Sequence, residues 1–445
     1  MSTIARKLDG VQTTAGLGSF MTTFDTEPFE YYERLRERGD LVWDEEQQVW
    51  IASTYAALKE IGLADKVKWG DPFGRYDPAH PPFGVAEDDW RDYIGGATVL
   101  QQVDDDLHNT MHRWWMRTLS PKVLQLWGET LVDPIIAETI RELFPDGKVD
   151  SNEFVQVITL RSVAAVLGLP HDMEWLQLFS ATGLRLLAIF SNSMKYLDPA
   201  QAAANPEDIK SSLAGSVEFQ SMIMEHVKAK KPVDGATQDP TEAGLDFIRL
   251  IWETGDQLFG TTEFSDIDVR GHAFQAVIAS LESINSAARN GFYLLATHPE
   301  LHDVIRSDPR AAQNFVQEVL RLHGSVEFRS RRALEDIEVQ GTLVKQGEMV
   351  VCVIGSANRD PKKYEDPYEL KLDRPSPRDH FGFFQGPRMC AGQNLARFLL
   401  EHFFVRTLDQ IYDLRLDPEA PRPRYSGSLI RRWDPVKILF TPPES

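Results

Sequence analysis

The sequence predicts a mainly α-helical protein with small β-sheets, folded as one large domain. Three observations support this fold class. Most segments between Leu107 and Phe328 have helical periodicity, the strand signals are short, and no linker, repeat or low-complexity segment divides the chain. A chain of 445 residues would by length alone suggest two or three domains. Because no linker supports a split, we expect one catalytic domain at residues 29–445, preceded by an N-terminal extension at residues 1–28.

The elements follow from local periodicity and turn residues. The expected helices are Pro134–Leu143, Ser151–Leu167, Trp175–Phe190, Ser211–Lys228, a very long one near Asp266–Thr297, and a final one from about Gly392 to Tyr412. The expected strand regions are Val42–Ser53, Ile337–Val344 and Met349–Ile354. The expected loops are Trp69–Asp106, which is rich in Gly, Pro and Asp and should contain short helical turns, Leu197–Glu207 and Lys231–Gly244.

Composition and charge exclude several classes of protein. The chain is 42% hydrophobic and 26% charged, which is typical of a globular protein. Its 47 basic and 67 acidic side chains give a formal charge of −20, which would repel phosphate backbones and anionic lipid. No apolar run is long enough for a membrane span, and the N-terminus lacks a signal peptide. Two cysteines form no disulfide framework, so we expect a cytoplasmic protein that binds neither nucleic acid nor membrane.

The most informative segment runs from His380 to Arg397, HFGFFQGPRMCAGQNLAR. Its cysteine, Cys390, stands between two glycines and directly before a helix. Glycine lets the backbone turn tightly and lets a flat cofactor approach. The free N–H groups and positive end of the helix dipole favour a thiolate over a thiol. A buried structural cysteine is the alternative, and for a lone cysteine it would normally be preferred.

This segment resembles the proximal loop of the cytochrome P450 family. The family pattern Phe-x-x-Gly-x-(His/Arg)-x-Cys-x-Gly is matched by Phe383, Gly386, Arg388, Cys390 and Gly392. The resemblance implies the cytochrome P450 fold, a haem b cofactor whose iron is bound by the Cys390 thiolate, and monooxygenase activity. It also implies that Arg388 points toward a haem propionate. Many members carry a second glycine after the phenylalanine, where this chain has Phe384.

A second motif is Glu318-Val-Leu-Arg321. Its i,i+3 spacing places both charges on one helix face, where such pairs are usually solvated. The family has a Glu-x-x-Arg of this kind that pairs with an arginine of the Pro-rich stretch. The resemblance therefore implies a structural triad of Glu318, Arg321 and Arg374.

Several side chains are candidates for binding the haem propionates. The family places a histidine and an arginine four residues apart on an early helix. Here His108 fills the first position, and the second falls on His112 or on the neighbouring Arg113. Metal binding by the two histidines is an alternative, but a metalloprotease would need Glu where this chain has Asn109. Ten residues after Arg321, Arg331 resembles a further propionate-binding arginine, with Arg329 as a competitor for that role.

The long helix near Asp266–Thr297 would span on the order of 45 Å and should be buried along its length. Polar residues interrupt it at Glu282 and Ser283. Counted back from His298-Pro299, these two positions carry the family's acid–alcohol pair, which delivers protons during oxygen activation. The family usually has Thr at Ser283 and Gly at Ser280. A groove in the helix would therefore depend on one of these serines bonding back to the preceding turn.

The resemblance also points to the regions that contact substrate. In this chain they offer an apolar lining, which suits an apolar small molecule. The candidates are Trp69, Phe73, Phe83, Val99, Leu187, Phe190, Phe274, Val277, Ile278 and Val326. Glu327 and Arg329 are possible polar anchors.

Electrons must come from a separate protein, because the sequence has no dinucleotide-binding motif and too few cysteines for an iron–sulfur cluster. We expect a monomer that docks an acidic ferredoxin on Arg113, Arg117 and Lys122. The expected reaction is hydroxylation or O-dealkylation. The alternatives are a peroxygenase, which tends to lack the acid–alcohol pair, and a haem-binding sensor or carrier without turnover.

Overall fold

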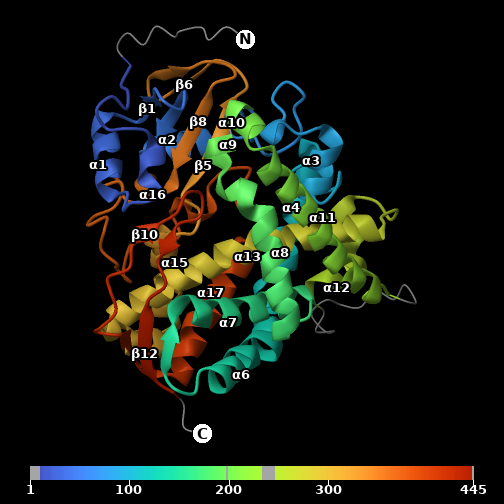
Figure 1. The fold of residues 1–445 in the computed structure, drawn as a ribbon, viewed down its shortest axis with the longest axis vertical. Helices are drawn as coiled ribbons and strands as arrows, with labels where there is room; N and C mark the ends of the chain where they lie inside the picture. The colour runs from blue at the N-terminus through green and yellow to red at the C-terminus, as the bar shows by residue number, and fades with distance from the viewer. Residues whose placement is uncertain (1–10, 197–198, 233–245, 443–445) are drawn as a thin grey trace.

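The computed structural model describes residues 11–196, 199–232 and 246–442. A five-stranded sheet lies in its upper part as drawn in Figure 1, and helices make up most of the remainder. The strand order is β1-β2-β8-β5-β3. The hairpin β1 (Leu41–Asp44) and β2 (Val49–Ala52) lies at one edge, and β8 (Met349–Val353) runs parallel to β2. β5 (Phe328–Ala333) is antiparallel to β8 and to the short edge strand β3 (Trp69–Gly70).

The remaining strands form smaller sheets. A three-stranded sheet has the order β4 (Lys148–Asp150), β12 (Lys437–Thr441), β9 (Tyr412–Leu416). Two hairpins pair β6 (Ile337–Val339) with β7 (Thr342–Val344), and β10 (Tyr425–Ser426) with β11 (Arg432–Trp433).

The helices follow in chain order. In the first half they are α1 (Phe29–Arg38), α2 (Tyr55–Leu63), α3 (Glu87–Ile94), α4 (Asp105–Thr118), α5 (Pro121–Trp127), α6 (Asp133–Leu143), α7 (Ser151–Leu167), α8 (Met173–Ser191), α9 (Ser193–Tyr196) and α10 (Pro199–Ala204). They continue with α11 (Pro206–Ala229), α12 (Phe247–Phe259), α13 (Asp266–Thr297), α14 (His302–Ser307), α15 (Pro309–His323), α16 (Ile354–Ala357) and α17 (Gln393–Gln410). Short 3₁₀ turns occur at Phe20–Thr23, Pro82–Gly84, Pro299–Leu301 and Phe381–Phe383, and a π-helical turn at Gly128–Val132.

The long helix α13 crosses the middle of the molecule in Figure 1. A capping box starts it, in which the side chains of Ser265 and Asp268 each bond to the other residue's backbone N–H. Its apolar side chains join the main core together with those of α7 and α17. Because this helix packs against neighbours along its length, the few positions at which it is left uncovered are informative.

The predicted fold class is confirmed, and two helices, Ser151–Leu167 and Asp266–Thr297, have both predicted ends. The prediction of a loop at Leu197–Glu207 is wrong, because its alanine-rich run forms α10 and a proline at the first turn begins α11. The loop predicted at Lys231–Gly244 falls, from residue 233 onward, outside the described residues.

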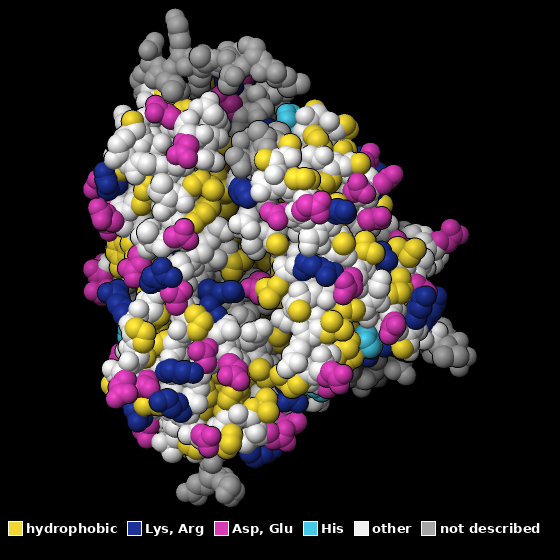
Figure 2. Space-filling model, viewed as in Figure 1, with side chains coloured by type: hydrophobic (Ala, Val, Ile, Leu, Met, Phe, Trp, Pro, Cys, Tyr) yellow, Lys and Arg dark blue, Asp and Glu magenta, His cyan; other side chains and the backbone are white. Residues whose placement is uncertain are grey.

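The segment before α1 contributes to the same core as the sheet. Thr13 bridges to Trp43 of β1, and Phe20 is fully buried against the sheet and Phe328. Acidic and basic side chains are interspersed over the face shown in Figure 2. Among the described residues, every helix is too short or too polar to cross a bilayer.

Candidate active site

The loop before α17 is fixed by backbone contacts. The N–H of Cys390 donates to the carbonyl of Phe383 (3.0 Å), and the N–H of Met389 donates to that of Gly386 (3.1 Å). Gly386 has φ +89°, and a Cβ at this position would collide with the carbonyl of Gly62 near the end of α2. Only glycine fits where the loop touches α2, which is the physical reason for this position of the motif.

Phe384 occupies the position at which many family members have glycine, and its backbone conformation shows why. Its φ of +57° and ψ of −171° lie in a region that is essentially reserved for glycine. The ring is nevertheless buried, and it lies 5.1 Å from the guanidinium of Arg331 on β5. The loop therefore accepts backbone strain and places an aromatic ring over a strand arginine.

The sulfur of Cys390 lies in a protected but accessible position. The residue is exposed, yet desolvation by surrounding protein raises the pKa of the thiol. The backbone N–H of Gly392 and the charges of Arg329 and Arg397 act in the opposite direction, because they lower the pKa and favour the thiolate. Accessible surface and desolvation together indicate that the sulfur faces an interior space.

The middle of α13 is uncovered along one stripe. Gln275, Ile278, Glu282 and Ser283 are partly exposed and Ala279 is exposed, while most positions around them are buried. Spacings of three and four residues place these positions on one face of the helix. An otherwise buried helix therefore presents one open stripe.

Both serines of this region bond back to the helix. The hydroxyl of Ser283 donates to the carbonyl of Ala279, and that of Ser280 donates to the carbonyl of Ala276 (2.7 Å). Each hydroxyl thus has its proton engaged and its oxygen lone pairs free to accept. The alternatives left open by the sequence are both realised, because each serine makes this bond.

Glu282 forms an ion pair that was not predicted from the sequence. Its carboxylate lies 2.5 Å from Nη1 of Arg432 on β11, and the same nitrogen is 3.5 Å from the hydroxyl of Ser286. The two partners are separated by 150 residues, so only the folded chain could reveal the contact.

Glu318, Arg321 and Arg374 form a fully satisfied cluster, here called the triad. Both carboxylate oxygens of Glu318 accept from Arg321 (2.7 and 2.8 Å), and one also accepts from Nε of Arg374 (2.9 Å). The remaining N–H groups of the two arginines donate to backbone carbonyls, including that of Glu369, which accepts from both. The triad therefore links α15 to the Pro-rich stretch that contains Arg374.

A second group of charges lies near the Cys390 loop and is here called the cradle: Lys66, His108, Arg388 and Arg329. The ammonium of Lys66 donates to Nδ1 of His108 (2.6 Å), and burial together with Lys66 and Arg388 lowers the pKa of His108 to about 4. Burial and Arg388 also lower the pKa of Lys66, and Nε of Arg388 has no hydrogen-bond partner. Cations that depress one another's protonation indicate that positive charge is in excess here.

The two arginines of β5 differ in their partners. Nε and Nη2 of Arg331 donate to Asp65, at 3.1 and 2.9 Å, and both side chains are almost fully buried. Arg329 is exposed and, within the part of the chain that the structure describes, makes neither a hydrogen bond nor an ion pair. Asp65 and Lys66 are residues that the sequence analysis missed, and nothing in their local sequence distinguishes them.

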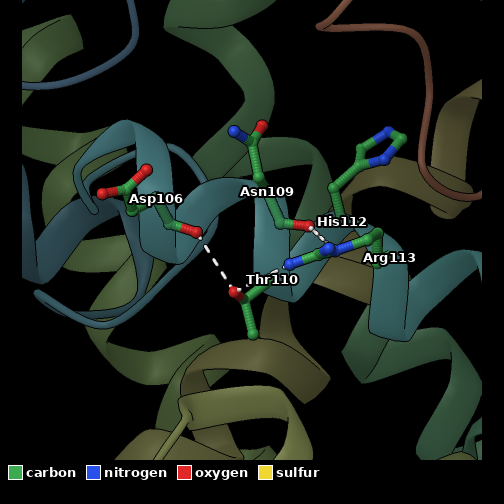
Figure 3. Close-up of a pocket in the computed structure, with 5 residues that line it drawn as sticks. All are labelled: Asp106, Asn109, Thr110, His112 and Arg113. Atoms are coloured by element: carbon green, nitrogen blue, oxygen red, sulfur yellow. Dashed lines mark hydrogen bonds between the residues drawn. The ribbon is translucent and has the colours of Figure 1, made fainter.

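The structure separates the neighbouring candidates His112 and Arg113. The ring of His112 stacks beside that of His108, and its Nε2 donates to the carbonyl of Met389 (2.8 Å), next to Cys390. Arg113 is on the outer side of α4, where it bonds to the carbonyl of Asn109 and to Thr110 and lines a surface pocket (Figure 3). His112 lines the same pocket, so the two residues are separated by their bonds. His112 bonds to the loop of Cys390, whereas the bonds of Arg113 are to its own helix, which makes it the poorer candidate for a ligand to an interior cofactor.

The predicted substrate-lining residues divide into two sets. Val99, Phe274 and Val277 are completely buried, as is Trp69, so they belong to the core and cannot line an accessible cavity in this conformation. The remainder are an aromatic cluster and three partly exposed aliphatic side chains: Phe73, Phe83 and Phe190 with ring centroids 5.1–5.8 Å apart, and Leu187, Ile278 and Val326.

These features fit a haem. A cysteine sulfur is accessible, a stripe of α13 is uncovered, and several cations lie near the cysteine loop, one of which, Arg388, has an Nε without a hydrogen-bond partner. A flat iron-containing ring with two carboxylate groups would supply the missing contacts and the missing negative charge.

Comparisons with known proteins also point to a haem protein. The sequence profile of the family "Cytochrome P450" matches residues 174–440. The 6-deoxyerythronolide B hydroxylase of Saccharopolyspora erythraea is 26% identical over 84% of this chain and 86% of its own length. The cytochrome P450 monooxygenase PikC of Streptomyces venezuelae is 25% identical over 94% of each chain.

Solved structures share the fold. The crystal structure of CYP109E1 from Bacillus megaterium in complex with corticosterone has a TM-score of 0.71 and 22% identity, and covers 93% of this chain and 98% of that one. The structure of CalO2 has a TM-score of 0.72 and 21% identity, and covers 94% and 97%. The chain therefore belongs to the cytochrome P450 family and is a haem-dependent monooxygenase.

Proposed function

We propose that Cys390 is the thiolate ligand of a haem b, and that the enzyme hydroxylates or O-dealkylates an apolar small molecule with electrons from a separate ferredoxin. The observation that carries the ligand assignment is the position of the sulfur. It is accessible from an interior space, it accepts from the N–H of Gly392, and it lies in a loop fixed by Gly386. His108, His112 and Arg388 would hold the propionate edge, with Lys66 as an additional cation.

When bound, the haem supplies the iron at which dioxygen is reduced and activated. The residues of α13 would manage protons and water beside it. Ser283, whose proton is committed to the carbonyl of Ala279, has lone pairs free to order a water molecule. Glu282 would exchange protons with solvent after leaving its ion pair with Arg432.

The substrate proposal depends on the apolar character of the candidate lining. Phe73, Phe83 and Phe190 form one aromatic cluster, and Leu187 on α8 and Ile278 on α13 present partly exposed aliphatic surface. A lining of this kind favours an apolar organic molecule. The structural relative CYP109E1 was crystallised with corticosterone, which is consistent with a substrate of that class for this chain.

For the electron donor we propose a docking surface on α4 and α5. Arg113 and Arg117 are exposed on α4, and Lys122 is exposed at the start of α5. These cations would attract an acidic ferredoxin although the chain as a whole carries a charge of −20. Reduction by such a partner should slow as salt is raised, and a rate independent of salt would contradict this surface.

The experiment that tests the proposal is an optical titration of the purified protein with terpenes, aromatic ethers, fatty acids and steroids. A substrate that displaces water from ferric iron moves the Soret band to shorter wavelength. The ferrous carbonyl spectrum of the same protein reports thiolate ligation, and Cys390→His should abolish that signature while retaining haem. A thiolate spectrum that survives in Cys390→His would overturn the ligand assignment.

Turnover separates a monooxygenase from a haem sensor or carrier, and it also tests Ser283. Ser283→Ala should lower the amount of product formed per NADH consumed and raise hydrogen peroxide. Ser221→Ala is the matched control, because Ser221 makes the same bond to its own helix at an exposed site on α11. Unchanged coupling in Ser283→Ala would count against its role.

A further inference from the structure

Arg329 and Arg331 lie on the same face of β5, because alternate residues of a strand point to the same side. Their Cα atoms are therefore about 7 Å apart, a separation that two long side chains can bridge to reach one group. β3 pairs only with Arg332 and Ala333, so it ends before it reaches Arg329. The two side chains can therefore reach the same space beside β5, but they have different partners in the protein.

Arg331 is held on two sides. Asp65, which is completely buried, accepts two hydrogen bonds from its guanidinium, and Asp71 lies 3.9 Å away. The ring of Phe384 packs over the same guanidinium at 5.1 Å. Breaking a buried and doubly hydrogen-bonded ion pair is costly, because it leaves a carboxylate without a partner in the protein interior. Arg331 is therefore committed to the protein.

The conformation of Phe384 reinforces this arrangement. Holding a non-glycine residue at its positive φ costs about 1–3 kcal/mol, which the surrounding structure must offset. The ring that the strained backbone presents is the one that covers Arg331. Asp65 and Phe384 thus act on the same side chain from two parts of the chain that are distant in sequence.

Arg329 has the opposite surroundings. Its side chain is exposed and has no hydrogen-bond or ion-pair partner among the residues that the structure describes. Surrounding protein desolvates its guanidinium and lowers the pKa, although the side chain remains accessible. The charges of Asp71, Cys390 and Asp65 are close enough to act on this guanidinium, Asp71 the most strongly of the three. With no hydrogen-bond partner among the described residues, this guanidinium can still bind a carboxylate through two N–H groups.

We infer that Asp65 withdraws Arg331 from the cofactor and that Arg329 is the β5 arginine that binds a haem propionate. This inference rests on the proposed haem site and replaces the role expected for Arg331 from the sequence. A bidentate pair with a carboxylate matches the geometry of the guanidinium and supplies the anion that Arg329 lacks. Asp65 has the separate role of a positioning residue, which holds Arg331 and stands 3.6 Å from Arg388.

The test measures how fast ferric holoprotein transfers its haem to an excess of apomyoglobin. Arg329→Gln should lose haem at least about tenfold faster than the unmodified protein, since hydrogen bonds to charged groups are strong. Arg331→Gln alone would strand Asp65, so the matched variant is Asp65→Asn/Arg331→Gln, which replaces the ion pair with two neutral amides. This double variant should lose haem within about threefold of the unmodified rate.

Arg332→Gln is the control, because Arg332 points to the opposite face of β5 and bonds to the carbonyl of Gly347. It should leave haem transfer unchanged. Rapid haem loss by the double variant with normal retention by Arg329→Gln would overturn the inference. Normal retention by Arg329→Gln with weakened binding of a carboxylate-bearing ligand would overturn it too, and would make Arg329 a substrate anchor.

Failure of the haem assignment itself would be seen elsewhere. The ferrous carbonyl spectrum reports the Cys390 ligand and should remain of the thiolate type in Arg329→Gln, because Arg397 and the start of α17 still favour the thiolate. A thiolate spectrum with accelerated haem loss therefore supports Arg329. Loss of the thiolate spectrum in Arg329→Gln would instead show that the main role of this side chain is to stabilise the thiolate, and would overturn its assignment to the propionate.

Discussion

The triad and the cradle are both clusters of charged side chains, yet their hydrogen bonds are organised in opposite ways. In the triad, Glu318 neutralises part of the charge of two arginines, and backbone carbonyls accept their remaining N–H groups. In the cradle, Lys66 and Arg388 depress the protonation of His108, and Nε of Arg388 has no hydrogen-bond partner, with Asp65 at 3.6 Å. One cluster is complete within the protein. In the other, the carboxylates of Asp65 and Asp105 lie only at long distances of 3.6 and 3.9 Å from the cations.

This difference separates residues that hold the fold from residues that await a ligand. A completed network stabilises the chain whether or not a cofactor is present. A cluster with surplus positive charge destabilises the free protein through repulsion among its cations. Binding of an anion offsets this repulsion, so the cluster is stabilised only in the complex. Substitutions in the two clusters should therefore affect different measurements.

The largest effect is expected in the triad. Glu318→Gln leaves two buried guanidiniums without a counter-charge, so the free energy of unfolding should fall by about 3–5 kcal/mol. Urea unfolding of the holoprotein, followed by far-ultraviolet circular dichroism, measures it. Glu335→Gln is the control, because Glu335 is exposed and forms a long surface pair with Lys68, worth about 0–1 kcal/mol. Equal effects of the two substitutions would show that the triad is not a stabilising network.

Phe384 allows strain and burial to be separated in the loop that borders the cradle. Phe384→Ala loses the buried ring and keeps the unfavourable φ, whereas Phe384→Gly loses the ring and relieves the strain. Both should be destabilised by roughly 2–4 kcal/mol, with the alanine variant about 1 kcal/mol the less stable. Thermal or urea unfolding of the two variants side by side measures this difference. A glycine variant less stable than the alanine variant would argue that the loop is unstrained.

These residues show which parts of the site could be predicted from the sequence. The Cys390 loop and the spacing of Glu318 and Arg321 could be found because their partners are set by local spacing and by a family pattern. Asp65, Lys66 and Arg432 could not, because their partners lie 42 to 266 residues away along the chain and their residue types are ordinary. Val99 and Val277 were expected to line a pocket, but periodicity cannot distinguish a wall of the core from a wall of a cavity.

In the cradle, Lys66→Met should have little effect on stability and a clear effect on haem retention, unlike Glu318→Gln. Removing one of several mutually repelling cations should leave the free energy of unfolding within about 1 kcal/mol of its original value. Haem transfer to apomyoglobin should accelerate several-fold, because a propionate would lose a cationic partner. Lys68→Met, at an exposed position two residues later, is the control and should change neither quantity. A large loss of stability in Lys66→Met without faster haem loss would mean that the cradle holds the fold.

The smallest expected effect compares two buried histidines, one near each cluster. Burial lowers the pKa of His380, near the triad, to about 3, and that of His108, in the cradle, to about 4. Both values are below the ordinary value of 6.5, so between pH 6.5 and 4 the unfolded chain binds more protons than the folded one. The stability that each neutral histidine contributes is complete above pH 6.5 and is lost as the pH falls.

Haem carboxylates beside His108 should raise its pKa and reduce its contribution to the pH dependence of stability, but they should leave His380 unaffected. In the holoprotein, His380→Gln should therefore flatten the decline of stability between pH 7 and 5 more than His108→Gln does. Urea midpoints measured across this range test the difference, and an equal flattening would mean that no anion is bound beside His108.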